Sequence, residues 1–267
     1  MCTAIIGFEP GALVLLAGIR DELADRPWLP PARHWPRYPD LTGGKDLQAG
    51  GTWLAVAPRR RRVACVLNAP GRMADPARRR SRGSLPLAAA AGGATEQPDL
   101  SGFDPFHLIT GDLERVTVTS WDGTRLSERE LGPGTHLLVN HGLGADLMAS
   151  KVAAAQQGRG LTAELARIRR FGPAFGNARR PVPGDGPPAD AWGEWFPLVN
   201  GDGLATDDPA ALIVRRELPD GRIWGSTSVS LVALAPDRVR YDFTATPGDA
   251  GSWYRVAGLE AGKEAAI

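Results

Sequence analysis

The chain has 267 residues, a length at which a largely β protein still folds as one unit, so we expect a single domain over residues 1–267. Apolar residues make up 43%, and the 33 glycines and 23 prolines indicate many turns, which argues against a helix bundle. The 31 basic and 30 acidic residues nearly cancel, which excludes a net field that attracts nucleic acid or an anionic membrane.

The first residues predict a β-hairpin. Residues 3–8 have the pattern of a strand, residues 9–11 that of a turn, and residues 12–19 that of its apolar partner. The apolar run 12–17 is far shorter than the roughly 20 residues of a membrane span. No basic segment precedes an apolar core, so we expect neither a signal peptide nor a membrane span and place the protein in the cytoplasm.

The rest of the chain alternates strands with a few helices. Residues 27–51 are rich in Pro, Gly and Trp and show the hydrophobic period of neither a helix nor a strand, which predicts a long ordered loop. Residues 179–188 predict a surface loop. The composition and patterning therefore predict a mixed, mostly β protein of the α+β class. Strands are expected at 52–56, 62–67, 106–110, 116–121, 125–130, 226–235 and 238–244, and helices at 84–91 and 151–171.

Two basic runs occur, at residues 59–62 and 78–82. A polyanion site would need aromatic residues interleaved with the bases, and none are present. We interpret both runs as a solvated turn and a solvated loop edge.

Cys2 directly follows the initiator methionine, and a cysteine there is small enough for Met1 to be removed. The freed α-amino group, with a pKa of about 8, would be a general base beside the thiol. Such a site needs a carboxylate to hold the amine and donors for the oxyanion. Arg20 and Asp21, at the end of the second predicted strand, can return beside Cys2, whereas Cys65 lies in the apolar run 63–67, and a disulfide is not expected in the cytoplasm.

Several motifs follow one another densely in the first fifth of the chain. They are Met1-Cys2-Thr3, Arg20-Asp21-Glu22, Asp25-Arg26-Pro27 and Gly43-Gly44-Lys45-Asp46-Leu47-Gln48-Ala49-Gly50-Gly51-Thr52-Trp53-Leu54. With these motifs the chain resembles the NRDE family, also called the transport and Golgi organisation family. That family is similar to N-terminal-nucleophile hydrolases of the choloylglycine and penicillin acylase type. The resemblance implies an α+β fold of that type, a four-layer αββα sandwich.

The resemblance also implies roles for individual residues. Cys2 would attack a carbonyl carbon while its own amine moves the proton, and Asp21 would orient the amine. Arg20 would favour the thiolate, although a surface ion pair at a turn is the alternative for this dipeptide. Asn68 and Asn140, each at a strand end, would donate to the oxyanion or the substrate, and the alternative for both is a turn-forming asparagine.

Further residues are candidates for the substrate pocket. His141 follows Asn140, and Trp53, Gly50 and Gly51 belong to the glycine-rich run. This run lacks the end of a phosphate-binding P-loop and the spacing of a dinucleotide fingerprint, so a close approach of its backbone to Cys2 is favoured. The alternative for Trp53 is a core anchor. The four histidines lack ligand spacing, so we expect no metal and no cofactor.

Three positions depart from the family pattern. Ile19 stands where the family name has Asn, Val139 replaces a small Ser, and Thr227 occupies a place where the family often has Arg. These changes keep the nucleophile and alter the pocket around it.

Three functions agree with these observations. The first is an amidase- or acylase-like hydrolase of C–N or C–O bonds that uses an N-terminal cysteine. The second is a non-catalytic haem or acyl-lipid binding and trafficking protein on the same scaffold, and the third a bacterial enzyme of secondary metabolism with a substrate of its own. The expected partner is a small molecule, such as an acyl amide, an ester or haem. The sequence is also compatible with a homo-oligomer.

Overall fold

A computed structural model describes residues 2–92, 99–150 and 159–259. Within these ranges most strands belong to an eight-stranded sheet. Its strands, in spatial order, are β11 (Gly142–Leu143), β10 (Gly134–Val139), β1 (Thr3–Glu9), β2 (Leu13–Leu23), β13 (Ile223–Leu234), β14 (Val239–Thr244) and β15 (Tyr254–Arg255), with β12 (Arg215–Glu217) pairing with β13. All neighbouring strands are antiparallel. The first predicted hairpin and the last one thus form the middle of one sheet.

A five-stranded antiparallel meander forms the second sheet. It contains β5 (Leu54–Ala57), β6 (Arg62–Asn68), β7 (Phe106–Gly111), β8 (Val116–Trp121) and β9 (Leu126–Leu131). Each of these strands was predicted within three residues of its observed ends, because each is a short run that turn residues separate from the next.

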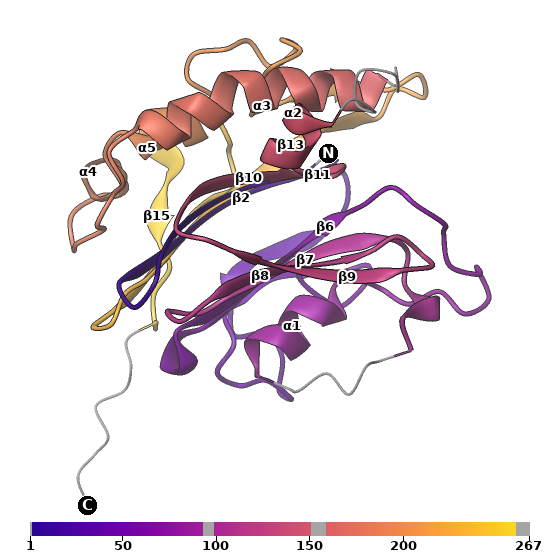
Figure 1. Ribbon diagram of the computed structural model, residues 1–267, viewed down its shortest axis with the longest axis horizontal. Helices are drawn as coiled ribbons and strands as arrows, with labels where there is room; N and C mark the ends of the chain where they lie inside the picture. Colours follow the sequence, from indigo (N-terminus) through magenta and orange to yellow (C-terminus); the bar gives the residue numbers. More distant parts are fainter. Residues whose placement is uncertain (1, 93–98, 151–158, 260–267) are drawn as a thin grey trace, which may run out of the picture.

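The helices lie outside the two sheets. They are α1 (Ser84–Ala90), α2 (Gly144–Ala149), α3 (Arg159–Asn177), α4 (Pro188–Trp192) and α5 (Trp195–Val199). Figure 1 shows α3, α4 and α5 on the outer side of the eight-stranded sheet, the five-stranded sheet on its other side, and α1 beyond that. No helix among the described residues has the length and apolar character to cross a membrane.

Alternation along β1 and β2 places neighbouring residues in different cores. Ala4 and Ile6 pack into the cluster between the two sheets, whereas Ile5 belongs to the cluster under the helices. Both faces of the central strands are therefore buried, which explains why residues 12–19 are apolar without a polar alternation.

The prediction of a loop over residues 27–51 is wrong in part. This segment contains the two-stranded sheet of β3 (Trp28–Ala32) and β4 (Gly43–Asp46). The pairing register shifts between Leu29 and Ala32, so the two intervening prolines need not donate to the ladder. Trp28 anchors the hairpin with its ring 5.8 Å from the rings of Trp53 and of Phe243.

The longest helix differs from its prediction at its end. Residues 151–158 of the predicted range lie outside the described residues, and the observed helix continues to Asn177. It continues because Phe175 is fully buried, with its ring 5.1 Å from that of Trp195 on α5.

Candidate active site

Cys2 lies at the start of β1, in the middle of the eight-stranded sheet. Thr3 pairs with Ile19 on β2, so the next residues outward are Cys2 and Arg20. The Cys2 side chain is half-buried and packs against the cluster between the two sheets, and its thiol points to the main-chain oxygen of Asp21 at 3.8 Å. The strand pairing thus brings Cys2 beside the Arg20-Asp21 dipeptide.

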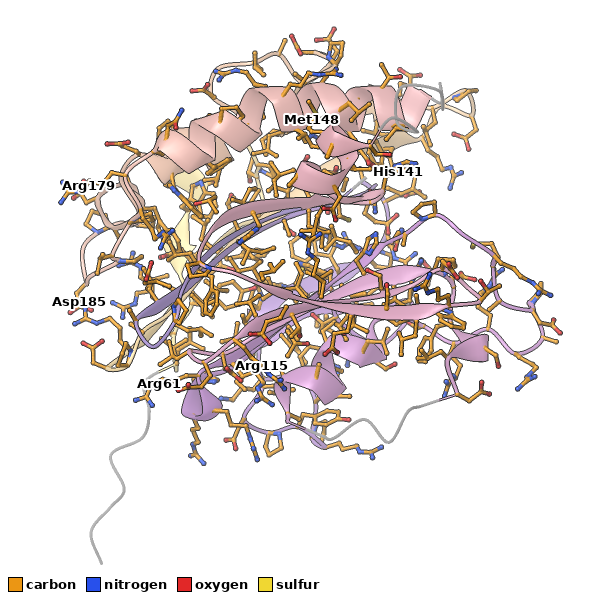
Figure 2. All side chains as sticks on the ribbon, in the orientation of Figure 1. Arg61, Arg115, His141, Met148, Arg179 and Asp185 are labelled. Carbon is orange, nitrogen blue, oxygen red and sulfur yellow. The ribbon has the colours of Figure 1, made fainter. Side chains whose placement is uncertain are left out.

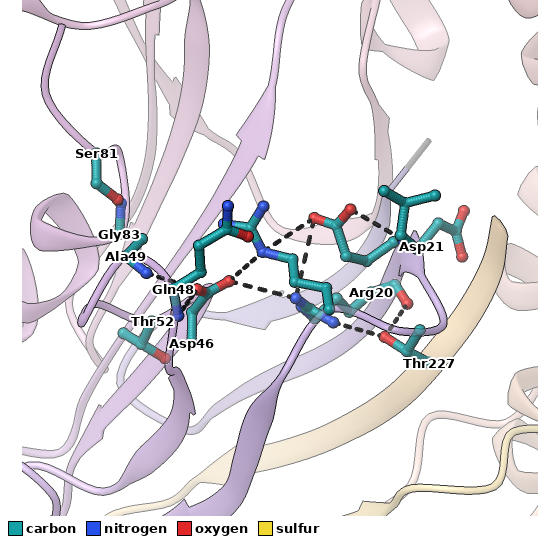
Figure 3. A network of polar contacts seen from close by, with 12 residues as sticks. Arg20, Asp21, Asp46, Gln48, Ala49, Thr52, Ser81, Gly83 and Thr227 are labelled. Carbon is teal, nitrogen blue, oxygen red and sulfur yellow. Dashed lines mark hydrogen bonds and ion pairs between the residues drawn. The ribbon is translucent and has the colours of Figure 1, made fainter. Parts of the chain in front are cut away.

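Arg20 belongs to the same face of the sheet as Cys2, as the alternation of β2 requires. Its guanidinium lies 4.6 Å from the Trp53 ring centroid. It donates to Thr227 Oγ1 at 2.8 Å and to an Asp46 carboxylate oxygen at 3.4 Å (Figure 3). Arg20 is only 5% exposed, so its charge acts in a poorly hydrated environment.

Asp21 points to the opposite face, under α3. Its Oδ1 accepts a hydrogen bond of 2.6 Å from the Ser226 hydroxyl, and its Oδ2 lies 4.0 Å from Nη1 of Arg167. Arg167 is fully buried on α3 and also donates to Thr3 Oγ1 at 2.7 Å and to the Ala211 carbonyl at 2.9 Å. The Asp21 carboxylate, which lies beneath the start of β1, is therefore held by Ser226 of β13 and by Arg167 of α3.

A β-bulge supplies both hydroxyl partners. The pairing of β13 with β2 is irregular between Ser226 and Ser228, where Thr227 is the extra residue. Ser226 reaches Asp21 and Thr227 reaches Arg20, which lie on different faces of β2. The departure from arginine at position 227 therefore leaves a hydroxyl that binds Arg20.

The electrostatic environment sets the protonation of the thiol. Burial raises the pKa of Cys2, and the Asp21 carboxylate adds to this, while the Asp21 main-chain contact and the charge of Arg20 oppose it. Burial also raises the pKa of Asp21, against the effects of Arg167 and Ser226. At neutral pH the thiol is protonated and needs a base to become a nucleophile.

A cavity of about 560 Å³ opens beside these residues. Five of the predicted site residues line it: Cys2, Arg20, Asp21, Trp53 and Asn68. A small molecule of moderate size fits a cavity of this volume.

Asn140 lies next to Asn68 and outside the cavity lining. Its Nδ2 donates to the main-chain oxygen of Asn68 at 2.6 Å, and its Oδ1 is buried without a hydrogen-bond partner among the described residues. Its own main-chain oxygen contacts the His107 ring at 3.1 Å. In this arrangement the Asn140 amide positions the end of β6.

His141 lies on the helix side of the eight-stranded sheet (Figure 2). Its Nδ1 is 2.7 Å from a carboxylate oxygen of Glu164, a fully buried residue of α3, and its main-chain N–H donates to the same oxygen at 3.1 Å. His141 does not line the cavity, and its contacts are those of a strand-to-helix connection.

Gly50 and Gly51 also lie outside the cavity lining. Gly50 adopts φ +73° and accepts a 2.8 Å hydrogen bond from the Trp35 indole. A Cβ on Gly51 would lie 2.4 Å from the carbonyl carbon of Gly83. The close approach made by the glycine-rich run is therefore to the segment around Gly83.

Asp46 orders the glycine-rich run. Its Oδ1 accepts from the main-chain N–H groups of Gln48 and Ala49 at 3.0 and 2.8 Å, and its Oδ2 accepts from Arg26 at 2.6 Å (Figure 3). Burial alone raises the pKa of Asp46, but the bonds from Arg26 and Ala49 and the charge of Arg20 outweigh it and lower that pKa.

Sequence reasoning missed Arg167 and Glu164. Both are charged and fully buried on α3, and Glu164 falls on the helix face that also presents Leu161, Ile168 and Phe171. A charge within such an apolar stripe is the signal that could have identified them. No cluster of three or more potential metal ligands occurs in the described part of the chain.

The chain is similar to known proteins in sequence and in fold. The family model for transport and Golgi organisation 2 matches residues 1–167. Among solved structures, the fold resembles a C2A mutant of conjugated bile acid hydrolase from Clostridium perfringens. The TM-score is 0.51 at 11% identity, over 96% of this chain and 92% of the hydrolase. A search of curated proteins finds no significant match.

Proposed function

The chain belongs to the transport and Golgi organisation 2 family, and from this premise we propose that it is a hydrolase of amide or ester bonds with Cys2 as N-terminal nucleophile. The observation that carries the proposal is the placement of Cys2 and Arg20 on one cavity wall with the Asp21 carboxylate under the same strand end. The two sheets and their outer helices are then the four layers of an αββα sandwich, in one domain.

Removal of Met1 is the first step of the proposed mechanism. It leaves the α-amino group on Cys2 itself, one residue before Thr3, whose hydroxyl is bound by Arg167. Asp21, held by Ser226 and Arg167, is close enough to this strand end to orient the amine. The raised pKa of the Cys2 thiol makes this internal base necessary.

Hydrolysis then proceeds through a thioester. The amine takes the thiol proton as sulfur attacks the carbonyl carbon, and it returns that proton to the departing amine or alcohol. Water next attacks the thioester with the same amine as base, releases the acid and restores the thiol. Arg20 stabilises the thiolate, and of the two predicted amide donors Asn68 is the one that lines the cavity.

The test combines mass spectrometry with hydrolysis. The intact mass of the purified chain should lack Met1, and p-nitrophenyl esters and p-nitroanilides of graded acyl length should be hydrolysed. Cys2→Ala should lose at least about 100-fold in rate, because it removes the nucleophile. Cys65→Ala is the matched control, since Cys65 is buried outside the cavity lining. Retained Met1, or equal rates for Cys2→Ala and wild type, would contradict the proposal.

A carrier of haem or an acyl lipid is the competing function. Titration of the Cys2→Ala variant with haemin and with fatty acids separates the two. A carrier keeps its affinity when Cys2 is replaced, and wild-type protein then hydrolyses none of the esters or anilides.

A further inference from the structure

The basic run at residues 78–82 is largely exposed, as expected from the sequence, but it also borders the cavity. Arg79, Arg80 and Arg82 line the cavity together with Arg20 and Arg26. The acidic residues that line it are Glu22, Asp46 and Asp104, together with Asp21, whose carboxylate points to the other face of the sheet, so the five arginines outnumber the four acidic residues. The cavity therefore favours a negatively charged ligand.

Most of these arginines already have a counter-ion. Arg26 and Arg20 bind Asp46 at 2.6 and 3.4 Å. Arg79 lies 3.1 Å from Asp104, and Arg80 donates to the Asp99 main-chain oxygen with its guanidinium 4.3 Å from the Phe103 ring centroid. These contacts hold the four side chains without an external anion.

Arg82 and Arg80 both lack a carboxylate within ion-pair distance among the described residues, but Arg80 is exposed and its guanidinium lies over the Phe103 ring. The Nη1 of Arg82 donates to the Pro105 carbonyl at 2.8 Å. Its side chain is half-buried, and burial lowers its pKa, while the charges of Asp104 and Cys2 oppose that shift. A guanidinium keeps its proton under such conditions, so it presents unused donors to the cavity.

The backbone around Gly83 fixes the segment that carries Arg82 beside the cavity. Gly83 crosses Gly51 so closely that a Cβ on either would be 3.0 Å or less from backbone atoms of the other segment. The Gly83 carbonyl also accepts from the Thr52 N–H at 2.9 Å, next to Trp53 of the cavity wall. The guanidinium is thus carried by a segment tied to the same wall as Arg20.

We propose that Arg82 binds an anionic group of the substrate, a carboxylate or a phosphate, while the bond to be cleaved lies at Cys2. An arginine without a counter-ion in a partly desolvated site forms charge-assisted, bidentate hydrogen bonds with either group. The inference rests on the proposed function in placing the reacting carbonyl at Cys2. The substrate class is then an acyl amide or ester that carries a negative charge.

Alkylation of Cys2 tests this without any hydrolysis. Iodoacetate and iodoacetamide have the same leaving group and nearly the same size, and only iodoacetate is charged. The rate ratio of iodoacetate to iodoacetamide at Cys2, followed by peptide mass spectrometry, is divided by the same ratio for free cysteine. We expect the normalised ratio to be roughly tenfold above one, because the cavity attracts the anion.

Two variants make the test specific. Arg82→Gln should lower the normalised ratio at least about fivefold, because only iodoacetate loses an attractive charge, whereas a change in the thiolate fraction of Cys2 slows both reagents equally and cancels in the ratio. Arg78→Gln is the matched control, since Arg78 belongs to the same basic run, is 65% exposed beside Asp99 and does not line the cavity. It should leave both rates unchanged, and circular dichroism should be the same for both variants.

Several outcomes would overturn the anion site. These are a normalised ratio near one, equal ratios in Arg82→Gln and Arg78→Gln, or no reaction of Cys2 with either reagent. Acetate and inorganic phosphate, added at constant ionic strength, should slow the iodoacetate reaction, and the stronger competitor identifies the preferred group. A chain that prefers iodoacetate yet hydrolyses nothing would contradict the proposed function and leave the anion site in place.

Discussion

Arg20 and Asp21 are neighbours in sequence and act on opposite faces of the same strand. Arg20 faces the cavity between the sheets with Cys2, and Asp21 is held beneath by Ser226 and Arg167. This follows from the period of a strand, which turns successive side chains to opposite faces. An adjacent arginine and aspartate can therefore serve the thiol and the amine of one residue separately.

The charge of Arg20 should be visible in the titration of Cys2. Arg20 lowers the pKa of the thiol against the raising effect of burial. Arg20→Met removes that positive charge, so the pKa should rise and the fraction of thiolate at neutral pH should fall several-fold. The pH profile of Cys2 alkylation by iodoacetamide measures the midpoint. Arg20→Lys keeps the charge and should restore the midpoint; an unchanged midpoint in Arg20→Met would refute the electrostatic role.

At the scale of elements, Arg167 connects α3 to two strands of the sheet. It contacts Thr3 on β1 and Asp21 on β2, and it is fully buried. Removing one member of a buried ion pair leaves the other charge without compensation. Removing one of the two charges should therefore cost more stability than removing both.

A double-mutant cycle measures the coupling of the two charges. Arg167→Met should lower the free energy of unfolding by about 3–5 kcal/mol, and Asp21→Asn in the same chain should restore part of it. Urea unfolding gives the values. Arg170→Met is the control, because Arg170 pairs with Asp202 at the surface of the same helix and should cost no more than about 1 kcal/mol. Strictly additive single-mutant losses would show that the two charges are not coupled.

The ordering of the glycine-rich run by Asp46 should depend on pH. The pKa of Asp46 in the folded chain lies below its ordinary value of about 3.9, so its charge stabilises the fold above that pH. This contribution is lost as the pH falls through the lowered pKa. Asp46→Asn should cost about 1–3 kcal/mol at pH 7, and the difference in stability between the two proteins should shrink as the pH falls below about 3.9. Unfolding curves at several pH values test this, and a difference that does not shrink at acid pH would contradict it.

The elements that sequence predicted are those whose pattern is local. The strands of the meander and the hairpin of β13 and β14 show their alternation or apolar runs directly. β3 and β4 were missed because prolines and paired glycines conceal a hairpin whose stability comes from Trp28 packing on residues distant in sequence. α4 and α5 have five residues each, too few for a helical period, and are fixed by the buried Trp192 and Trp195.

The candidate site shows the same division. Cys2, Arg20, Asp21 and Asn68 could be predicted to meet because they stand near the ends of the predicted strands within recognisable motifs, although the observed β2 continues to Leu23. Arg82 was assigned to a solvated loop because only the crossing of Gly83 over Gly51 turns that run toward the cavity. Contacts between segments far apart in the chain carry no local pattern, so these residues emerged only from the fold.

At the scale of the whole molecule, the fold makes the start of the chain a fixed part of the cavity wall. β1 lies between β2 and β10, so Cys2 is held by pairing on both sides of the strand that follows it. A residue placed before Cys2 leaves this pairing intact and converts the α-amine of Cys2 into an amide. Folding and catalysis should therefore respond differently to an N-terminal extension.

A cleavable N-terminal tag tests this separation. The tagged chain should have the circular dichroism and thermal midpoint of the mature chain but hydrolyse p-nitrophenyl esters about 100- to 10,000-fold more slowly, because the amide cannot act as base. Proteolysis that leaves Cys2 as the first residue should restore the rate, and a tag at the other end of the chain should have no effect. If the N-terminally tagged protein is as active as the cleaved one, the base is another group, and Asp21 then has no amine to orient.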